Sequence, residues 1–203
     1  MATDIDAIVN NLSSFFDMKG KSVIHVGAGG GQFINYAFNV RRVVAVDPDP
    51  TAILLLKDAI QRSGLEDRFK VVQGEFSSLS TRADVVLFEF CLHEMDNPAE
   101  ALRHAQSLAP EILILDHIPE SPWAWYACDE KKAARSWAAV RELCVVREAS
   151  FKATQYFPTY QQLLLKIGVL GEEAIARIQE FSEQEDIRIR MEYAMALLRR
   201  DAA

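Results

Sequence analysis

Four glycines follow an apolar run near the start of the chain, in the sequence VIHVGAGGGQF at residues 23–33. The β-branched residues before Gly27 are typical of a buried strand, and the residues after the turn favour the first turn of a helix. Glycine permits a positive φ and lets the backbone approach a ligand closely, and a helix N-terminus presents free N–H groups. The segment therefore predicts a binding site for a polar or anionic part of a ligand.

A carboxylate, Asp47, ends the next predicted strand. At that position it can accept hydrogen bonds from both hydroxyls of a ribose, and the alternative is that it caps the following helix. The pairing of a glycine turn with this acid favours the ribose role. A nicotinamide dinucleotide would need a third glycine or alanine where the chain has Gln32, so the GxGxG pattern disfavours a nicotinamide oxidoreductase.

Titratable side chains also end later predicted strands, within residues 89–94 and 116–118. Ligands of open α/β sheets bind outside the carboxyl ends of the strands, so we expect these side chains to converge near the glycine turn. Candidate general bases there are Glu89, His93, Glu94 and His117. His104, in the middle of a predicted helix, is expected to be solvated.

The elements that position these residues alternate along the chain. Apolar strands alternating with helices indicate a doubly wound α/β fold, a mostly parallel sheet with helices on both faces. No linker or repeat interrupts residues 1–203, which predicts a single domain with an N-terminal helix in 1–20 and helical cover segments at 119–145 and 158–183. Strands are expected at 23–26, 42–47, 69–73, 84–88, 111–115, 150–157 and 187–197, and helices at 4–18, after the glycine turn to Asn39, at 51–62, 98–108, 121–145, from Thr159 through Ile167, and at 172–181.

Composition narrows the class of protein. The 203 residues carry a formal net charge of −7, so a nucleic-acid partner is not expected. No apolar run reaches the roughly 18 residues of a membrane span, and the N-terminus does not resemble a secretory signal. Cys91, Cys128 and Cys144 show no metal or disulfide spacing. We therefore expect a cytoplasmic protein with no metal centre, and no membrane partner.

Five segments in order, GAGGG, VVAVD, VVQGEF, DVVLFEFCLHEMDNP and EILILDH, resemble the successive motifs of the class I S-adenosylmethionine-dependent methyltransferases. The similarity covers roughly residues 21–118. It implies a Rossmann-like seven-stranded sheet with an antiparallel last strand, and S-adenosylmethionine as the cofactor. The long closing strand after a helical insert is similar to the family's last strand.

The resemblance also implies the residues that hold the cofactor. The methionine portion would pass over the glycine turn, the ribose would bind Asp47, the adenine would lie beside Glu75 and Phe76, and Phe90 and Cys91 would border the sulfonium. His25 departs from the pattern, because the family usually has an acid there, and this leaves a non-catalytic cofactor-binding or scaffold protein as an alternative. The implied set is His25, Gly27, Ala28, Gly29, Gly31, Asp47, Pro48, Glu75, Phe76, Phe90 and Cys91.

The expected reaction is methyl transfer to a small-molecule acceptor. Because this is an in-line displacement, orientation can contribute about 7–11 kcal/mol, and a general base is optional. His117, His93 and Glu89 are the candidate catalytic residues. Trp123, Trp125 and Tyr126 follow the fifth strand and form a candidate substrate lid, which would select a small amphipathic or cationic acceptor; alternatively, these rings pack the next helix against the sheet.

Overall fold

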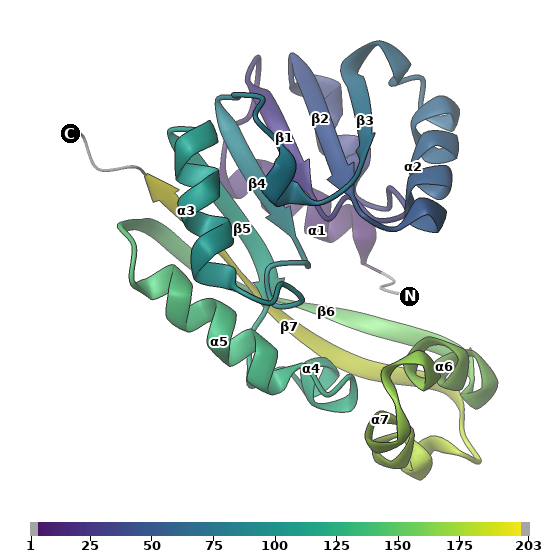
Figure 1. Cartoon of the computed structure of the whole chain (residues 1–203). Coiled ribbons are helices and arrows are strands. Elements are labelled where there is room, and N and C mark those ends of the chain that lie inside the picture. Colours follow the sequence, from purple (N-terminus) through teal and green to yellow (C-terminus); the bar gives the residue numbers. More distant parts are fainter. Residues whose placement is uncertain (1–3, 200–203) are drawn as a thin grey trace.

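The computed structural model describes residues 4–199, which fold around one seven-stranded sheet with the order β3-β2-β1-β4-β5-β7-β6 (Figure 1). Strand β7 runs antiparallel to both of its neighbours, and the remaining pairs are parallel. The predicted fold is therefore confirmed. The strands are β1 (Ser22–Val26), β2 (Arg42–Asp47), β3 (Phe69–Gln73), β4 (Val85–Glu89), β5 (Glu111–His117), β6 (Val145–Thr159) and β7 (Glu185–Arg199).

Helices cover both faces of this sheet and bury a separate apolar core on each. Leu12 and Leu56 pack into one core, and Leu102 and Trp137 into the other. The helices are α1 (Ile5–Phe15), α2 (Pro50–Arg62), α3 (Pro98–Leu108), α4 (Pro122–Tyr126), α5 (Glu130–Arg141), α6 (Tyr160–Ile167) and α7 (Glu172–Arg177), with 3₁₀ turns η1 (Ile34–Asn39), η2 (Glu66–Arg68), η3 (Phe76–Ser78), η4 (Gly168–Leu170) and η5 (Gln179–Phe181). Within residues 4–199, the structure contains no helix both long and apolar enough to cross a membrane.

The segment after the glycine turn differs from the prediction. It ends at Asn39 as expected, but it is the six-residue 3₁₀ helix η1 rather than the start of an α-helix. So short a helix has no substantial dipole, because the macrodipole is the sum of many aligned peptide units. The N–H groups available to a ligand are therefore those of the glycine turn itself.

The predicted helix over 121–145 is also wrong, since it is two helices. The chain turns between α4 and α5, where Cys128 has φ of 60°, and α5 ends at Arg141. Leu143 and Cys144 consequently lie outside the helix. The break matters for the site, because it brings Asp129 against His93.

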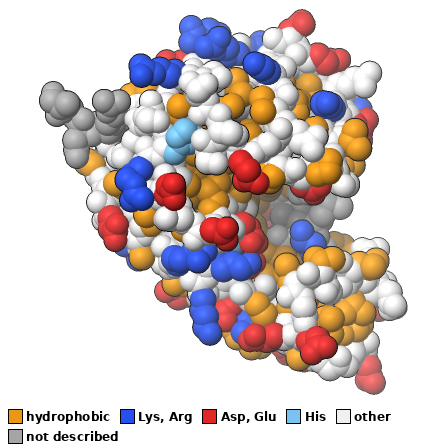
Figure 2. Space-filling view, viewed as in Figure 1, with side chains coloured by type: hydrophobic (Ala, Val, Ile, Leu, Met, Phe, Trp, Pro, Cys, Tyr) orange, Lys and Arg blue, Asp and Glu red, His pale blue; other side chains and the backbone are white. Residues whose placement is uncertain are grey.

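Helix α1 and the last two strands have different limits from those expected. Helix α1 ends at Phe15 instead of Met18, because Phe16 is already extended. Strands β6 and β7 are each 15 residues long, longer than the predicted 150–157 and 187–197. They reach beyond the other strands and carry α6 and α7 as a lobe (Figure 1). Figure 2 shows a recess between this lobe and the main body.

Candidate active site

The turn after β1 is closed by a tight contact with the segment after β4. Gly27 has φ of +69°, and a Cβ placed there would lie 2.3 Å from Cys91 Cβ and 2.6 Å from Cys91 Sγ. The Cys91 thiol donates a hydrogen bond to the carbonyl oxygen of Val26 at 3.2 Å. Glycine is required here by both the backbone angle and the space.

The third glycine of the GxGxG pattern has a packing role. Gly31 has φ of +76°, and a Cβ there would lie 2.9 Å from Ala59 Cβ and 3.1 Å from a Leu56 methyl carbon. Helix α2 thus packs directly against the turn. Ala28 points into the core on the same face and is buried, so its side chain contributes to packing.

Asp47 ends β2 beside the turn and is 8% exposed. Its Oδ2 accepts a hydrogen bond from the Gly29 N–H at 3.0 Å, and its Oδ1 accepts one from the Asp49 N–H at 2.9 Å. Asp49, not Asp47, caps α2 by accepting from the Thr51 N–H. The helix-capping alternative for Asp47 is therefore wrong, and since each carboxylate oxygen can accept more than one hydrogen bond, capacity for a ligand remains.

The first cavity lies at the carboxyl ends of β1, β2 and β3 and has a volume of about 620 Å³, within the range that holds cofactors and drug-sized ligands. Several of the predicted ligand residues share its wall: Gly27, Asp47, Pro48, Glu75, Phe76 and Cys91. The wall also includes residues with no predicted role at the site, among them Met95, Asp96, Asn97, Glu100 and His104.

His104 is half-buried rather than solvated as expected. Its Nε2 lies 3.0 Å from the Leu79 carbonyl oxygen, and its ring meets the Phe76 ring edge-on at 4.9 Å. Helical spacing did not reveal this, because the partners lie in the η3 segment some 25 residues earlier in the chain. The contact steadies one side of the first cavity.

His25 lies under the turn and is fully buried. Its Nε2 is 2.7 Å from Glu89 Oε2 and its Nδ1 is 3.1 Å from the Tyr36 hydroxyl. Burial raises the pKa of Glu89, although the hydrogen bond with His25 acts in the opposite direction. A carboxyl group from β4 therefore lies beside His25, the position at which the sequence resemblance implies an acid.

A second cavity, of about 270 Å³, lies between the strand ends and the α6–α7 lobe. Glu94 belongs to the walls of both cavities, so the two meet at that side chain. The wall includes all three candidate catalytic residues and the predicted sulfonium neighbour Phe90. Its residues are Gln32, Phe33, Glu89, Phe90, His93, Glu94, His117, Trp123, Ala127, Asp129, Gln155, Lys166, Val169, Leu170 and Met191.

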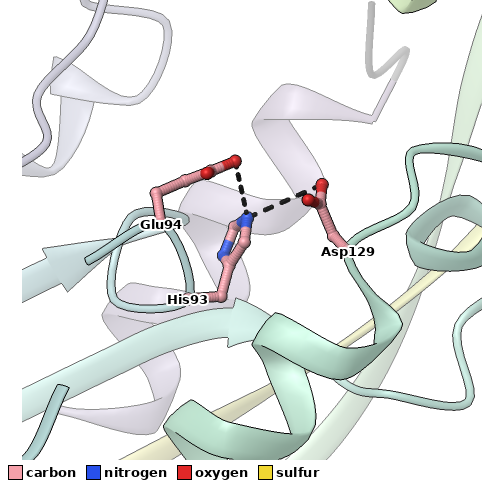
Figure 3. Close-up of side chains that lie close together, drawn as sticks. All are labelled: His93, Glu94 and Asp129. Atoms are coloured by element: carbon pink, nitrogen blue, oxygen red, sulfur yellow. Dashed lines mark ion pairs between the residues drawn. The ribbon is translucent and has the colours of Figure 1, made fainter. Parts of the chain in front are cut away.

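Three carboxylates lie close to the His93 ring, and Figure 3 shows two of them, Glu94 and Asp129. The His93 Nδ1 lies 2.6 Å from Asp116 Oδ1, and the Nε2 lies 3.3 Å from a Glu94 oxygen and 3.8 Å from an Asp129 oxygen. Burial opposes the imidazolium charge, but these acids outweigh it and raise the pKa of His93 to about 10. His93 is therefore a fixed cation at neutral pH and cannot accept a proton.

Ligand atoms of His93, Glu94 and Asp129 lie within 4.8 Å of one another, close enough to hold a metal ion. However, the Lys132 ammonium already lies 2.9 Å from both Glu94 and Asp129. The hydrogen bond from His93 lowers the pKa of Glu94 to about 2. The protein's own cations thus neutralise these carboxylates.

His117 ends β5 a short distance away and has the opposite character. Burial lowers its pKa to about 4, so its imidazole is neutral. The ring lies 4.7 Å from that of Phe90 and 5.4 Å from that of His93. Of the two histidines among the candidate bases, it is the one with a lone pair that can accept a proton at neutral pH.

The three aromatic residues of the candidate lid separate in space. Trp123 is buried, stacks on Phe157 and lines the second cavity. Trp125 is 45% exposed and lies beneath the Arg177 guanidinium, and the Tyr126 hydroxyl donates to Glu180 at 2.7 Å. Trp125 and Tyr126 therefore connect α4 to the α7–η5 segment, and of the three only Trp123 lines either of the two cavities described above.

Comparisons with known proteins agree with this geometry. The sequence model of the family described as "Methyltransferase domain" matches residues 1–160. Ribosomal protein L11 methyltransferases from Tolumonas auensis and Vibrio vulnificus are 33% and 36% identical to the chain over 73 residues. The aligned part makes up 35% of this chain and 25% of those proteins, so the chain matches about a quarter of their length.

Solved structures share the fold over nearly the whole chain. A Bacillus halodurans protein assigned as a methyltransferase has a TM-score of 0.69 at 19% identity, covering 94% of this chain and 97% of that one. A methyltransferase from Aquifex aeolicus that uses S-adenosylmethionine has a TM-score of 0.59 at 15% identity, covering 94% and 89%.

Proposed function

The chain belongs to the methyltransferase domain family, whose cofactor is S-adenosylmethionine, and from this premise we propose that it methylates a small molecule bound in the second cavity. The observation that carries the proposal is the pair of adjoining cavities that share Glu94, one lined by Asp47 and the glycine turn and the other by neutral His117. The cofactor supplies a methyl group activated on its sulfonium.

The first cavity fits the adenosyl group by its chemistry. Asp47 offers carboxylate oxygens to the ribose hydroxyls, Phe76 offers an aromatic ring to the adenine, and Glu75 offers an acceptor for the adenine amino group. Gly27 and Cys91 both line this cavity, so the methionine portion would pass beside the contact between them. We propose that the Glu89–His25 pair supplies the negative charge that the family's usual acid would provide there.

The size of the second cavity favours a small acceptor, because 270 Å³ lies just below the volume range of drug-sized ligands. A protein acceptor is the second candidate, since the curated relatives are named for a ribosomal protein. Nucleic acid is disfavoured by the net charge of −7. We also propose a cytoplasmic location, because the three cysteines of the sequence show no disulfide spacing.

Calorimetric titration and a methyl-transfer assay test the proposal together. We expect S-adenosylhomocysteine to bind and NAD to show no heat of binding. We also expect labelled methyl groups from S-adenosylmethionine to appear on members of a metabolite panel and not on ribosomal proteins. Binding without any transfer would favour the non-catalytic alternative, and transfer to protein alone would favour the second candidate.

Two tryptophan variants test the role of the second cavity. Trp123→Leu is expected to weaken acceptor binding about tenfold, because it removes a ring from the cavity wall, and to leave S-adenosylhomocysteine binding unchanged. Trp125→Leu is expected to change neither, because that ring lies under Arg177 outside the wall. The check is the KM for the acceptor beside calorimetry with S-adenosylhomocysteine. Equal effects of the two substitutions would contradict this prediction.

A further inference from the structure

Two buried side-chain atoms lack a hydrogen-bond partner among residues 4–199, and both belong to the second cavity. They are Nδ1 of His117 and Oε1 of Gln155, in side chains that line that cavity. Their residues are 7% and 8% exposed. Because the large majority of buried polar atoms in native proteins are paired, two orphans in one cavity wall point to a ligand that satisfies them.

The two unpaired atoms, His117 Nδ1 and Gln155 Oε1, can both accept a hydrogen bond from a ligand. The Gln155 amide nitrogen lies 3.1 Å from the Met191 sulfur, which leaves the amide oxygen as an acceptor without a donor. Neutral His117 has one lone pair and one N–H, so it too can accept a hydrogen bond. The complementary ligand therefore carries hydroxyl or N–H donors.

The apolar part of the wall contains three aromatic rings together with aliphatic side chains. The rings of Phe33 and Phe90 lie 5.7 Å apart, Phe90 contacts His117, and Trp123 adds a third ring. Flat apolar walls of this kind suit an aromatic ligand, which can stack or meet them edge-on. The volume of about 270 Å³ suits one ring with small substituents.

Charge argues against a cationic acceptor. Glu94 and Asp129 are paired with Lys132 and lie beside the His93 imidazolium, and Glu89 is hydrogen-bonded to His25. Lys166 is exposed and adds a positive charge at the edge of the cavity. Of the two acceptor types expected from the sequence, the wall therefore favours the amphipathic one.

We infer that the acceptor is a hydroxylated single-ring aromatic compound of the phenol class, with one hydroxyl donating to His117 and a neighbouring donor reaching Gln155. This inference rests on the proposed function. The hydroxyl proton passes to the His117 imidazole, an oxygen electron pair forms the bond to the methyl carbon, and the electrons of the broken carbon–sulfur bond stay on sulfur as a thioether. Asp116 and Glu94 favour the protonated imidazole, which then releases its proton to solvent, whereas His93 and Lys166 oppose it.

Binding of simple probes tests this without relying on turnover. Phenol, catechol and anisole are titrated into the full chain with S-adenosylhomocysteine present, by ligand-observed NMR. We expect catechol to bind most tightly because it has two donors, phenol to bind less tightly, and anisole to bind at least tenfold more weakly than phenol because it has none. With S-adenosylmethionine, catechol should yield its monomethyl ether, detected by mass spectrometry.

Two variants separate the roles of the orphan atoms. Gln155→Leu is expected to weaken catechol binding about tenfold and to leave phenol binding unchanged. His117→Asn is expected to lower the methylation rate about 100-fold, the scale of general base catalysis, with a smaller effect on catechol binding. Gln161→Leu, at an exposed position of α6, is the matched control and should change nothing. Unchanged affinity for S-adenosylhomocysteine verifies that each variant is folded.

The outcomes distinguish the inference from the proposed function. If S-adenosylhomocysteine binds but hydroxylated rings bind no better than anisole, the phenol-class acceptor is wrong and the methyltransferase assignment stands. If S-adenosylhomocysteine itself does not bind the folded chain, the proposed function fails. Methylation within threefold of normal in His117→Asn, or equal losses of phenol and catechol binding in Gln155→Leu, would also overturn the inference.

Discussion

Replacing Asp47 by alanine is expected to weaken the binding of S-adenosylhomocysteine about 1,000-fold. In the proposed complex the carboxylate accepts hydrogen bonds from two ribose hydroxyls, and each hydrogen bond to a charged group contributes about 1.5–3 kcal/mol. The sum of about 3–6 kcal/mol corresponds to a factor of about 10²–10⁴. The substitution also frees the Gly29 N–H, which Asp47 holds at 3.0 Å, so the glycine turn loses a constraint.

Calorimetry on the purified variant measures this loss. Asp58→Ala is the matched control, because it removes the same charge from an exposed position on α2, where Asp58 pairs with the exposed Arg62 at 2.6 Å. We expect the control to bind S-adenosylhomocysteine as the unmodified chain does. A folded Asp47→Ala protein with less than a fivefold loss of affinity would show that the ribose lies elsewhere.

Replacing Asp116 by alanine is expected to reduce the free energy of unfolding by about 3–5 kcal/mol, the usual effect of breaking a buried ion pair. Asp116 is 1% exposed, and its carboxylate accepts hydrogen bonds from the His93 ring and from the backbone N–H groups of His93 and His117. Alanine leaves all three donors buried without an acceptor. Urea denaturation measures the change, with Asp67→Ala at an exposed position as the control.

The pH dependence of stability tests the same cluster by a separate route. The pKa of His93 is raised from its ordinary 6.5 to about 10 in the folded chain. Because folding raises this pKa, the protonated His93 stabilises the folded state. This contribution is complete below about pH 6.5 and is lost as the pH rises toward 10. We expect the free energy of unfolding to fall by a few kcal/mol over that interval, and the fall to be much smaller in His93→Gln. Parallel curves for the two proteins would contradict a protonated His93.

The central strands could be predicted well because their signal is local. Runs of β-branched and aliphatic residues in β1, β2, β4 and β5 are buried on both faces, and such strands read as continuous apolar segments. The starts of α2 and α3 were predicted within one residue, at 51 and 98, because proline breaks the preceding segment; the structure adds that Asp49 and Asn97 cap these helices. The strand ends placed Asp47 and the glycine turn together, but the residues of α3 that complete the first cavity were not predicted.

The errors arose where distant contacts override local preference. Good helix formers surround Cys128, yet the helix breaks there, and the break places Asp129 3.8 Å from His93, a residue far away in the sequence. His104 looked solvent-exposed from helical spacing, but its partners belong to the η3 segment. Gln155 had no chemical signal at all, because strand β6 reaches the second cavity only through its pairing with β7.

By itself, the sequence determined the sheet, the glycine turn and the carboxylate beside it, because backbone preference and burial periodicity act over a few residues. Tertiary structure alone decided the protonation of the histidines. His93 and His117 have the same ordinary pKa and both lie near Asp116 and Glu94. The His93 ring bonds directly to these carboxylates, which raise its pKa, whereas burial is the largest effect on His117 and lowers its pKa, so His93 is protonated and His117 neutral at neutral pH.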